Sequence, residues 1–95
     1  MSTTHHSPLR LGILGCANIA KQFTRDVADS KQVSIQAVAS RDLAKAQAFA
    51  HSFHIARAHG SYEALLADGA LDAIYIPLPN SMHAEWAIRA MQAGK

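Results

Sequence analysis

The run Leu-Gly-Ile-Leu-Gly-Cys-Ala-Asn-Ile-Ala at residues 11–20 constrains the fold more than any other feature of the sequence. Its first half is apolar and predicts a buried strand, Gly15 permits a tight turn, and the following residues predict the start of a helix. Gly15, Ala17 and Ala20 form G-x-A-x-x-A, a softened form of the dinucleotide fingerprint G-x-G-x-x-G/A. Such a unit seats a pyrophosphate against helix N–H groups. It is also what any tight strand-to-helix turn requires, so the run alone leaves both interpretations open.

Composition limits what the chain can be. Its 95 residues suffice for one small domain with a modest core, and 49% hydrophobic with 17% charged residues is typical of a globular protein. The formal net charge of +2 is too small to favour nucleic acid or a membrane surface as a partner. Its one cysteine excludes an intrachain disulfide, and no signal peptide or apolar run of about 20 residues is found. We therefore expect a cytoplasmic protein.

Apolar and polar stretches alternate in a way that predicts strands and helices in succession. Residues 1–8 are polar, and we expect them to form a flexible lead-in. We expect strands over 9–14, 33–39, 56–59 and 71–76, and helices over 18–29, 42–53, 61–67 and 81–93. This alternation predicts an α/β fold with flanking helices and a parallel sheet of strand order 3-2-1-4. Because another strand is expected after the last helix, we expect the sheet to be incomplete at the C-terminus.

The predicted helices carry recognisable ends. Each begins at a residue whose side chain can accept a hydrogen bond from the first turn, namely Asn18, Asp42, Ser61 and Ser81. The last helix shows an apolar stripe, which predicts its buried face: Ala84, Ala87, Ile88 and Met91. Gly94 is suited to end that helix.

Ser40 and Arg41 follow the second predicted strand, about 25 residues beyond Gly15, close to where an acidic residue grips the ribose of NAD. A hydroxyl and a guanidinium suit a 2′-phosphate instead, which favours NADP over NAD. Asp42 keeps NAD open, since a carboxylate directed inward would hold a ribose hydroxyl. The plainer interpretation is a solvated arginine in a turn ahead of a capped helix.

The loop Pro-Leu-Pro-Asn-Ser-Met-His at residues 77–83 follows the fourth predicted strand. In strand order 3-2-1-4 the fourth strand lies beside the first, and ligands sit outside the carboxyl ends of strands at such a point. We therefore expect this loop to face the Gly15 turn, with Asn80 and His83 offering polar groups to a bound nicotinamide. Taken alone, the loop favours the plainer interpretation, in which Asn80 and Ser81 cap a helix and His83 lies on the surface.

Other reactive side chains favour structural roles. His51, His54 and His59 are near in sequence, but neither cysteine nor carboxylate completes a set at ligand spacing, so we expect no metal site. Cys16 would begin a helix, a place that can lower the pKa of a thiol, yet a pyrophosphate seated there would cover it. Trp86 is expected to pack in the core or at an interface, and Tyr75, inside a predicted strand, is expected to be structural.

Four segments carry a resemblance to a known family: residues 11–20, Ala-Val-Ala-Ser-Arg-Asp at 37–42, Ser-Tyr-Glu-Ala-Leu-Leu at 61–66, and Asp-Ala-Ile-Tyr-Ile-Pro-Leu-Pro-Asn-Ser-Met-His-Ala-Glu-Trp at 72–86. Together they resemble the start of the glucose–fructose oxidoreductase and inositol dehydrogenase (Gfo/Idh/MocA) family. The resemblance covers nearly the whole chain after Pro8. It is nearest to the branch that holds dihydrodiol dehydrogenases, D-xylose dehydrogenases and sugar ketoreductases.

The resemblance implies a parallel Rossmann-type sheet and an NADP-dependent oxidoreductase that moves hydride to or from a sugar or diol carbon. It implies that the pyrophosphate is lined by residues of the glycine turn: Gly15, Cys16, Ala17, Asn18 and Ile19. Ser40 and Arg41 would hold the 2′-phosphate. The nicotinamide side would be bordered by residues after the fourth strand: Leu78, Pro79, Asn80 and His83.

The resemblance also implies groups that this sequence lacks. In the family the Ala-Gly-Lys found here at 93–95 is followed by a strand ending in Glu-Lys-Pro, whose lysine is the expected proton donor, and by a substrate domain with a further catalytic histidine. We therefore expect residues 9–95 to be the N-terminal portion of a dinucleotide-binding domain, without catalytic residues and inactive alone. The alternative is a stand-alone nucleotide-binding or self-associating module, because the apolar fourth strand would be left as an unpaired edge that favours homo-oligomers.

Overall fold

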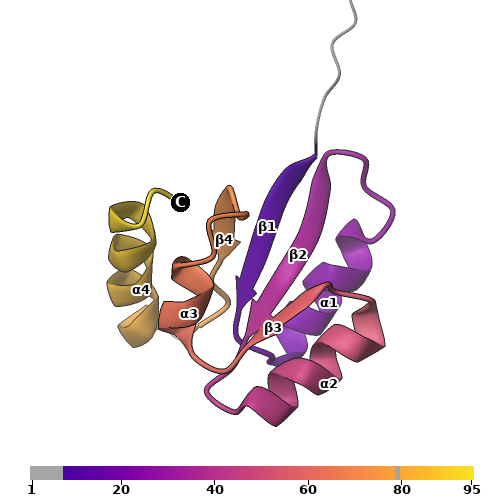
Figure 1. Cartoon of the computed structure of the whole chain (residues 1–95), viewed down its shortest axis with the longest axis horizontal. Helices are drawn as coiled ribbons and strands as arrows, with labels where there is room; N and C mark the ends of the chain where they lie inside the picture. The colour runs from indigo at the N-terminus through magenta and orange to yellow at the C-terminus, as the bar shows by residue number, and fades with distance from the viewer. Residues whose placement is uncertain (1–7, 79) are drawn as a thin grey trace, which may run out of the picture.

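The computed structural model describes residues 8–78 and 80–95, and within them four strands form one parallel sheet. These are β1 (Leu9–Leu14), β2 (Val33–Ala39), β3 (Arg57–His59) and β4 (Ala73–Tyr75). The strand order β3-β2-β1-β4 confirms the predicted Rossmann-type arrangement (Figure 1). Of the lead-in predicted over residues 1–8, all but Pro8 lies outside the described residues.

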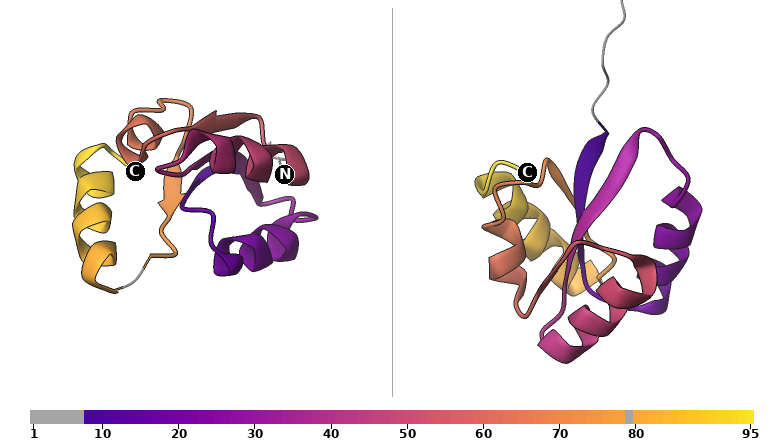
Figure 2. Two further views of the ribbon diagram at one scale, coloured as in Figure 1. Left: turned by 90° about the horizontal axis from the view of Figure 1, so that it is seen from below. Right: turned by 45° about the vertical axis from the view of Figure 1, so that its right-hand side comes forward.

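Helices cover both faces of this sheet. α1 (Asn18–Val27) and α2 (Leu43–Phe53) lie on one face, and α3 (Tyr62–Leu66) and α4 (Asn80–Gln92) lie on the other. Figure 2 shows α1 and α4 on opposite sides of the strands. Each helix agrees with its predicted range to within two residues at either end. Two covered faces are the condition under which a parallel sheet is stable.

Each face of the sheet buries its own set of side chains, because successive residues of a strand point to opposite faces. Ile13 and Val38 are fully buried and pack on the side of α1 and α2 with Ala20, Phe49, Ala50 and Ile55. The other face buries Leu14, Ala37, Ala39, Tyr62, Leu65, Leu66, Leu71, Trp86 and Ala90. The apolar run at the end of β1 therefore belongs to both cores.

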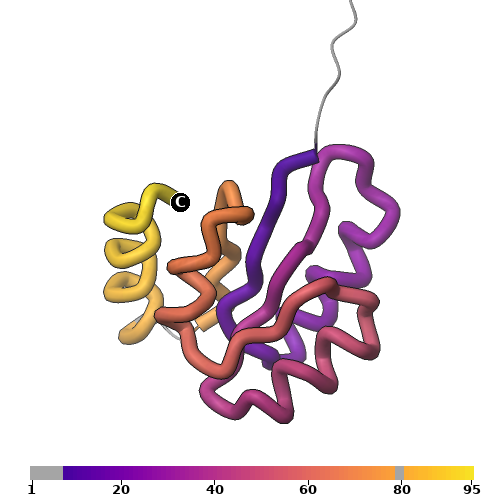
Figure 3. The backbone as a smooth tube through the Cα atoms, in the orientation of Figure 1, coloured from indigo at the N-terminus to yellow at the C-terminus, as the bar shows by residue number. Residues whose placement is uncertain are grey.

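β4 is shorter than the predicted range 71–76. Residues Ala73–Tyr75 pair with β1, with Leu11 opposite Ala73, so two segments far apart in the chain run side by side (Figure 3). Leu71 belongs to the preceding turn, because its N–H donates to the Asp68 carbonyl at 3.2 Å. Beyond Ile76, Pro77 has no N–H with which to extend the ladder. Among the described strands β4 pairs with β1 alone.

Two of the four predicted helix caps are confirmed. Asp42 accepts a hydrogen bond from the Ala44 N–H at 3.0 Å, and Ser61 accepts one from the Ala64 N–H at 3.1 Å. The prediction for Asn18 is wrong, because Asn18 is already helical and Ala17 occupies the cap position without a side-chain acceptor. The prediction for Ser81 is also wrong, since α4 begins at Asn80. Gly94 takes a φ of +82°, which confirms it as the residue that ends α4.

The predicted buried face of α4 is wrong. Trp86 and Ala90 are buried, whereas Ile88 is 51% and Met91 is 66% exposed. The Trp86 ring meets the Tyr62 ring edge-on at a centroid distance of 5.1 Å, and the burial of so large a side chain sets the rotation of the helix. Of the predicted stripe, Ala84 is likewise exposed and Ala87 is half-buried.

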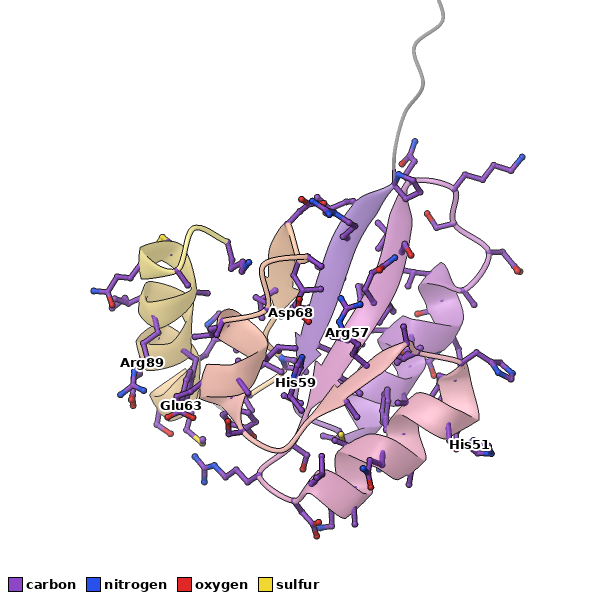
Figure 4. The ribbon with its side chains drawn as sticks, in the orientation of Figure 1. His51, Arg57, His59, Glu63, Asp68 and Arg89 are labelled. Atoms are coloured by element: carbon purple, nitrogen blue, oxygen red, sulfur yellow. The ribbon has the colours of Figure 1, made fainter. Side chains whose placement is uncertain are left out.

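Asp68 joins β3 to the turn before β4. Its carboxylate lies 2.8 Å from Arg57 Nε and 3.1 Å from His59 Nε2, and accepts the Ala70 N–H at 3.0 Å (Figure 4). Lys95 Nζ donates to the backbone carbonyl of the same residue at 2.9 Å. Burial works to raise the pKa of Asp68, but these hydrogen bonds outweigh it and lower the pKa to about 2. Asp68 is therefore ionised at neutral pH.

We predict that Asp68→Asn lowers the free energy of unfolding at neutral pH by about 1.5–3 kcal/mol, as expected for hydrogen bonds to a charged group. Because the pKa of Asp68 in the folded chain is about 2 and that of an unfolded aspartate is about 4, this stabilisation is present above about pH 4. It is lost as the pH falls toward about 2. Urea denaturation at about pH 7 and about pH 3 measures both effects.

The control for this prediction is Asp29→Asn, which removes an exposed carboxylate from the turn after α1. We expect it to change the free energy of unfolding by less than about 0.5 kcal/mol at either pH. An Asp68→Asn loss that is no larger than that of the control would contradict the structural role of Asp68.

Candidate functional site

The glycine turn stands at the carboxyl end of β1. Gly15 is buried and has a φ of +119°, a conformation that residues with a Cβ rarely adopt. Its N–H donates to the Ala39 carbonyl at 2.8 Å, which ties the turn to the end of β2. This hydrogen bond extends the pairing of β1 with β2 to the two strand ends that carry the predicted site residues.

The start of α1 is open to an anion. Ala17 occupies the cap position without a side-chain hydrogen bond, and the first turn of α1 carries no acidic residue. Ala17, Asn18 and Ile19 are exposed, and Ile19, a large apolar residue, is 58% exposed. The first N–H groups of a helix have no partner within it, and the helix dipole adds positive potential there. This arrangement, from Gly15 to Ile19, can bind a phosphate group through the backbone.

Ser40 is held firmly at the end of β2. Its N–H donates to the His59 carbonyl at 3.1 Å, its Oγ accepts the Asp42 N–H at 3.1 Å, and it is 9% exposed. Asp42 in turn uses Oδ1 to cap α2. One oxygen, Oδ1, of the carboxylate that would hold a ribose hydroxyl in the NAD alternative is thus engaged with the backbone.

Arg41 extends from the same turn toward the face of the sheet that α3 and α4 cover. Its guanidinium carbon lies 5.3 Å from the centroid of the Tyr62 ring. Arg41 is exposed, and among the described residues no carboxylate forms an ion pair with it. Within the described residues no carboxylate competes for its N–H groups, which suits a phosphate ligand.

A hollow of about 390 Å³ opens between α1 and α2 beside the glycine turn. It is lined by Cys16, Lys21, Lys45, Ala48, Phe49, Ser52 and Phe53. Burial raises the pKa of the Cys16 thiol, against smaller lowering effects of a hydrogen bond with Ser40 and of the charges of Lys21 and Lys45. The thiol is therefore neutral at pH 7 and unsuited to nucleophilic chemistry.

Lys21 and Lys45 belong to the site although no sequence motif indicated them. Each stands near the start of a helix that follows one of the two site strands, Lys21 in α1 and Lys45 in α2. Their positions in the sequence could have indicated them, because Lys21 follows the glycine turn by six residues and Lys45 follows Ser40 by five. Both place positive charge beside the glycine turn, which favours an anionic ligand.

The loop after β4 reaches the glycine turn as predicted. Leu78 Cδ2 lies 3.5 Å from the point where a Cβ on Gly15 would stand. Pro79 lies outside the described residues, and Asn80 is described as the first residue of α4. His83 is exposed and lines a separate groove, of about 350 Å³, between β4 and α4. The structure thus brings Leu78 to the glycine turn, whereas His83 lines the groove between β4 and α4.

Within residues 8–78 and 80–95, no three His, Cys, Asp or Glu side chains come together as a metal-binding group. His51 projects from α2 away from His59, which lies beside Arg57 and Asp68 (Figure 4). In the same part of the chain, the helices are too short or too polar to cross a membrane.

A family model matches residues 9–95. Its description is an oxidoreductase family with an NAD-binding Rossmann fold, and the match takes in every described strand and helix. It therefore covers the glycine turn, the end of β2 and the loop after β4 together.

Curated relatives match along almost the whole chain. D-xylose 1-dehydrogenase (NADP(+)) 2 of Haloferax volcanii is 46% identical over 90% of this chain and 26% of its own length. dTDP-3,4-didehydro-2,6-dideoxy-alpha-D-glucose 3-reductase of Saccharopolyspora spinosa is 44% identical over 93% of this chain and 26% of its own length. The chain thus spans about a quarter of the length of these relatives.

Solved structures share the fold. KijD10, a 3-ketoreductase from Actinomadura kijaniata crystallised with NADP and TDP-benzene, superimposes with a TM-score of 0.87 at 38% identity, over 93% of this chain and 27% of that one. Scyllo-inositol dehydrogenase from Lactobacillus casei, at 20% identity, shares the fold with a TM-score of 0.82.

We predict that Gly15→Ala destabilises the chain by about 1–3 kcal/mol, because alanine is strained at a φ of +119°. Gly69→Ala is the matched control, since a Cβ there would meet no atom within 4 Å. Urea denaturation of the two variants measures the difference. Equal stability of Gly15→Ala and Gly69→Ala would contradict the requirement for glycine at the turn.

Proposed function

Because the chain belongs to the oxidoreductase family with an NAD-binding Rossmann fold, we propose that it binds NADP(H) across the carboxyl ends of β1, β2 and β4. The observation that carries the proposal is the convergence of two groups on one end of the sheet. They are the start of α1, which has no side-chain cap, and the exposed Arg41 guanidinium, which forms no ion pair with a carboxylate of the described residues. We further propose that residues 9–95 form the N-terminal portion of the cofactor-binding domain of a longer enzyme.

The glycine turn is proposed to hold the pyrophosphate. A Cβ at residue 15 is disfavoured by the backbone, so the chain keeps this surface free of a side chain. N–H groups from Cys16 to Ile19 would donate to phosphate oxygens, and the exposed Ile19 side chain would be covered by the bound dinucleotide. These features fit the group that the family binds.

The turn after β2 is proposed to select NADP. The Arg41 guanidinium would donate to the 2′-phosphate, with the Ser40 side chain beside it. The charges of Lys21 and Lys45 lie beside the glycine turn, where they would favour the pyrophosphate. NAD remains an alternative cofactor, bound less tightly, because it lacks the group that Arg41 would grip. The capping role of Asp42 supports NADP over NAD.

The loop after β4 is proposed to border the nicotinamide half through Leu78, Pro79, Asn80 and His83. Leu78 contributes an apolar contact next to Gly15, which would exclude water from that part of the crevice. Bound NADP(H) supplies the chemistry of hydride transfer at its nicotinamide. The role of this chain is to bind and orient the dinucleotide.

The reaction is proposed to be hydride transfer between NADP(H) and a sugar or diol carbon. The relatives named above act on D-xylose or on a dTDP-linked sugar by their names, and both belong to that chemical class. We assign no catalytic residue to the described part of the chain. Tested by itself, the 95-residue chain is therefore expected to show no NADP-dependent oxidation of sugars above the blank.

We predict that Arg41→Ala raises the Kd for NADP about 10- to 100-fold, since a hydrogen-bonded charge is worth about 1.5–3 kcal/mol. The Kd for NAD should rise less than about threefold, because NAD has no 2′-phosphate. Isothermal titration calorimetry on the wild-type chain and the variant gives both constants. Arg25→Ala, an exposed arginine in the last turn of α1, is the matched control and should leave both constants unchanged. Equal losses for the two cofactors in Arg41→Ala would refute the phosphate role.

A second candidate function is self-association through β4, because β4 pairs only with β1 among the described strands. If this is its role, sedimentation velocity should show a homo-oligomer that grows with concentration while calorimetry detects no NADP binding. A concentration-independent monomer that binds NADP would exclude this alternative.

A further inference from the structure

We propose that Tyr62 is a positioning residue for cofactor selectivity: its ring holds the Arg41 guanidinium where a 2′-phosphate can reach it. The inference rests on the proposed function, and it adds to that function a residue from another element. Arg41 lies in the turn between β2 and α2, whereas Tyr62 is the first residue of α3 on the opposite face of the sheet.

Tyr62 is itself immobilised. It is 8% exposed and belongs to the core cluster that contains Leu65, Leu66 and Trp86. The Trp86 ring meets it edge-on at 5.1 Å with an interplanar angle of 88°. The helix that carries it begins at the Ser61 cap, where Oγ accepts the Ala64 N–H. The face of the ring that meets Arg41 is therefore fixed by the core.

Arg41 is fixed at its base and held at its tip. The Ser40 N–H bond to the His59 carbonyl and the Asp42 N–H bond to Ser40 Oγ set the backbone on either side of Arg41. The guanidinium carbon lies 5.3 Å from the Tyr62 ring centroid, within the range of a cation–π contact. Because Arg41 is an exposed residue, this contact restrains a side chain that would otherwise be long and flexible.

The contact with Tyr62 is compatible with hydrogen bonds from the Arg41 guanidinium to a ligand. A guanidinium carries five N–H donors in a planar fork, so a contact with one ring leaves N–H groups that can donate to a phosphate. An arginine already held in place loses less conformational freedom when the ligand binds. Tyr62 should therefore strengthen the binding of NADP more than that of NAD.

A role in packing alone predicts something different. If Tyr62 only fills the core, its replacement would lower stability and weaken both cofactors by the same factor. The ratio of the two dissociation constants, Kd for NAD divided by Kd for NADP, separates the two accounts, because it is unaffected by a uniform loss of folded protein.

The test compares Tyr62→Leu, which removes the ring, with Tyr62→Phe, which keeps it. Calorimetry on the full chain is expected to show the ratio falling about two- to fivefold in Tyr62→Leu, the range of an exposed cation–π contact, and unchanged in Tyr62→Phe. In an Arg41→Ala background, Tyr62→Leu should leave the ratio unchanged. A ratio that falls equally in Tyr62→Leu with and without Arg41, or that does not fall at all, would overturn the proposal.

A second measurement does not depend on a folded leucine variant. In the wild-type chain the side-chain protons of Arg41 should show upfield ring-current shifts in the NMR spectrum, and these should persist in Tyr62→Phe. Their absence in the wild-type chain would overturn the proposal. The outcomes also distinguish a failure of the proposed function from a failure of the role of Tyr62. If the wild-type chain does not bind NADP, the proposed function is refuted. If selectivity for NADP needs Arg41 but not Tyr62, only the role of Tyr62 is refuted.

Discussion

The parallel pairing of β1 with both β2 and β4 is the constraint on which the rest of the structure depends. β1 supplies the glycine turn, β2 supplies Ser40 and Arg41, and β4 leads into the loop with Leu78. Because all three strands run in one direction, their carboxyl ends meet at one edge of the sheet. The Gly15 N–H bond to the Ala39 carbonyl fixes the first two ends in register, and Leu78 brings in the third.

Charged groups at the other end and at the edge of the sheet keep this pairing in place. Arg10 donates two hydrogen bonds from its side chain to Asp72, at 3.1 and 2.8 Å, and so joins the start of β1 to the start of β4. Hydrogen bonds from Arg10 lower the pKa of Asp72 to about 2, so this carboxylate is also ionised at neutral pH. Asp68 likewise joins the turn before β4 to His59 of β3, and the His59 carbonyl accepts the Ser40 N–H. The ion pairs thus lie outside the cofactor site and support the strands that build it.

Local features of the sequence were sufficient to predict the order of elements, the parallel sheet and the caps at Asp42 and Ser61. Features that depend on tertiary packing were not predictable in this way. The rotation of α4 follows from the contact of Trp86 with Tyr62, which no periodicity within the helix reveals. Asn18 is not a cap because, after the turn at Gly15, the helix begins one residue earlier than predicted, with Ala17 in the cap position. The contact of Arg41 with Tyr62 joins the turn after β2 to the first residue of α3. Lys21 and Lys45 line one hollow only because α1 and α2 share a face of the sheet.

The most direct test of the account is an NMR titration of the chain with NADP that follows every backbone amide. The account predicts chemical-shift changes at the carboxyl ends of the strands, from Gly15 to Ile19 and at Ser40 and Arg41, with smaller changes at the latter two when NAD replaces NADP. Amides at the opposite end of the sheet, such as those of Val27 and Ser30 between α1 and the start of β2, should stay unchanged. Changes confined to that opposite end, or identical changes at Ser40 and Arg41 with both cofactors, would contradict it.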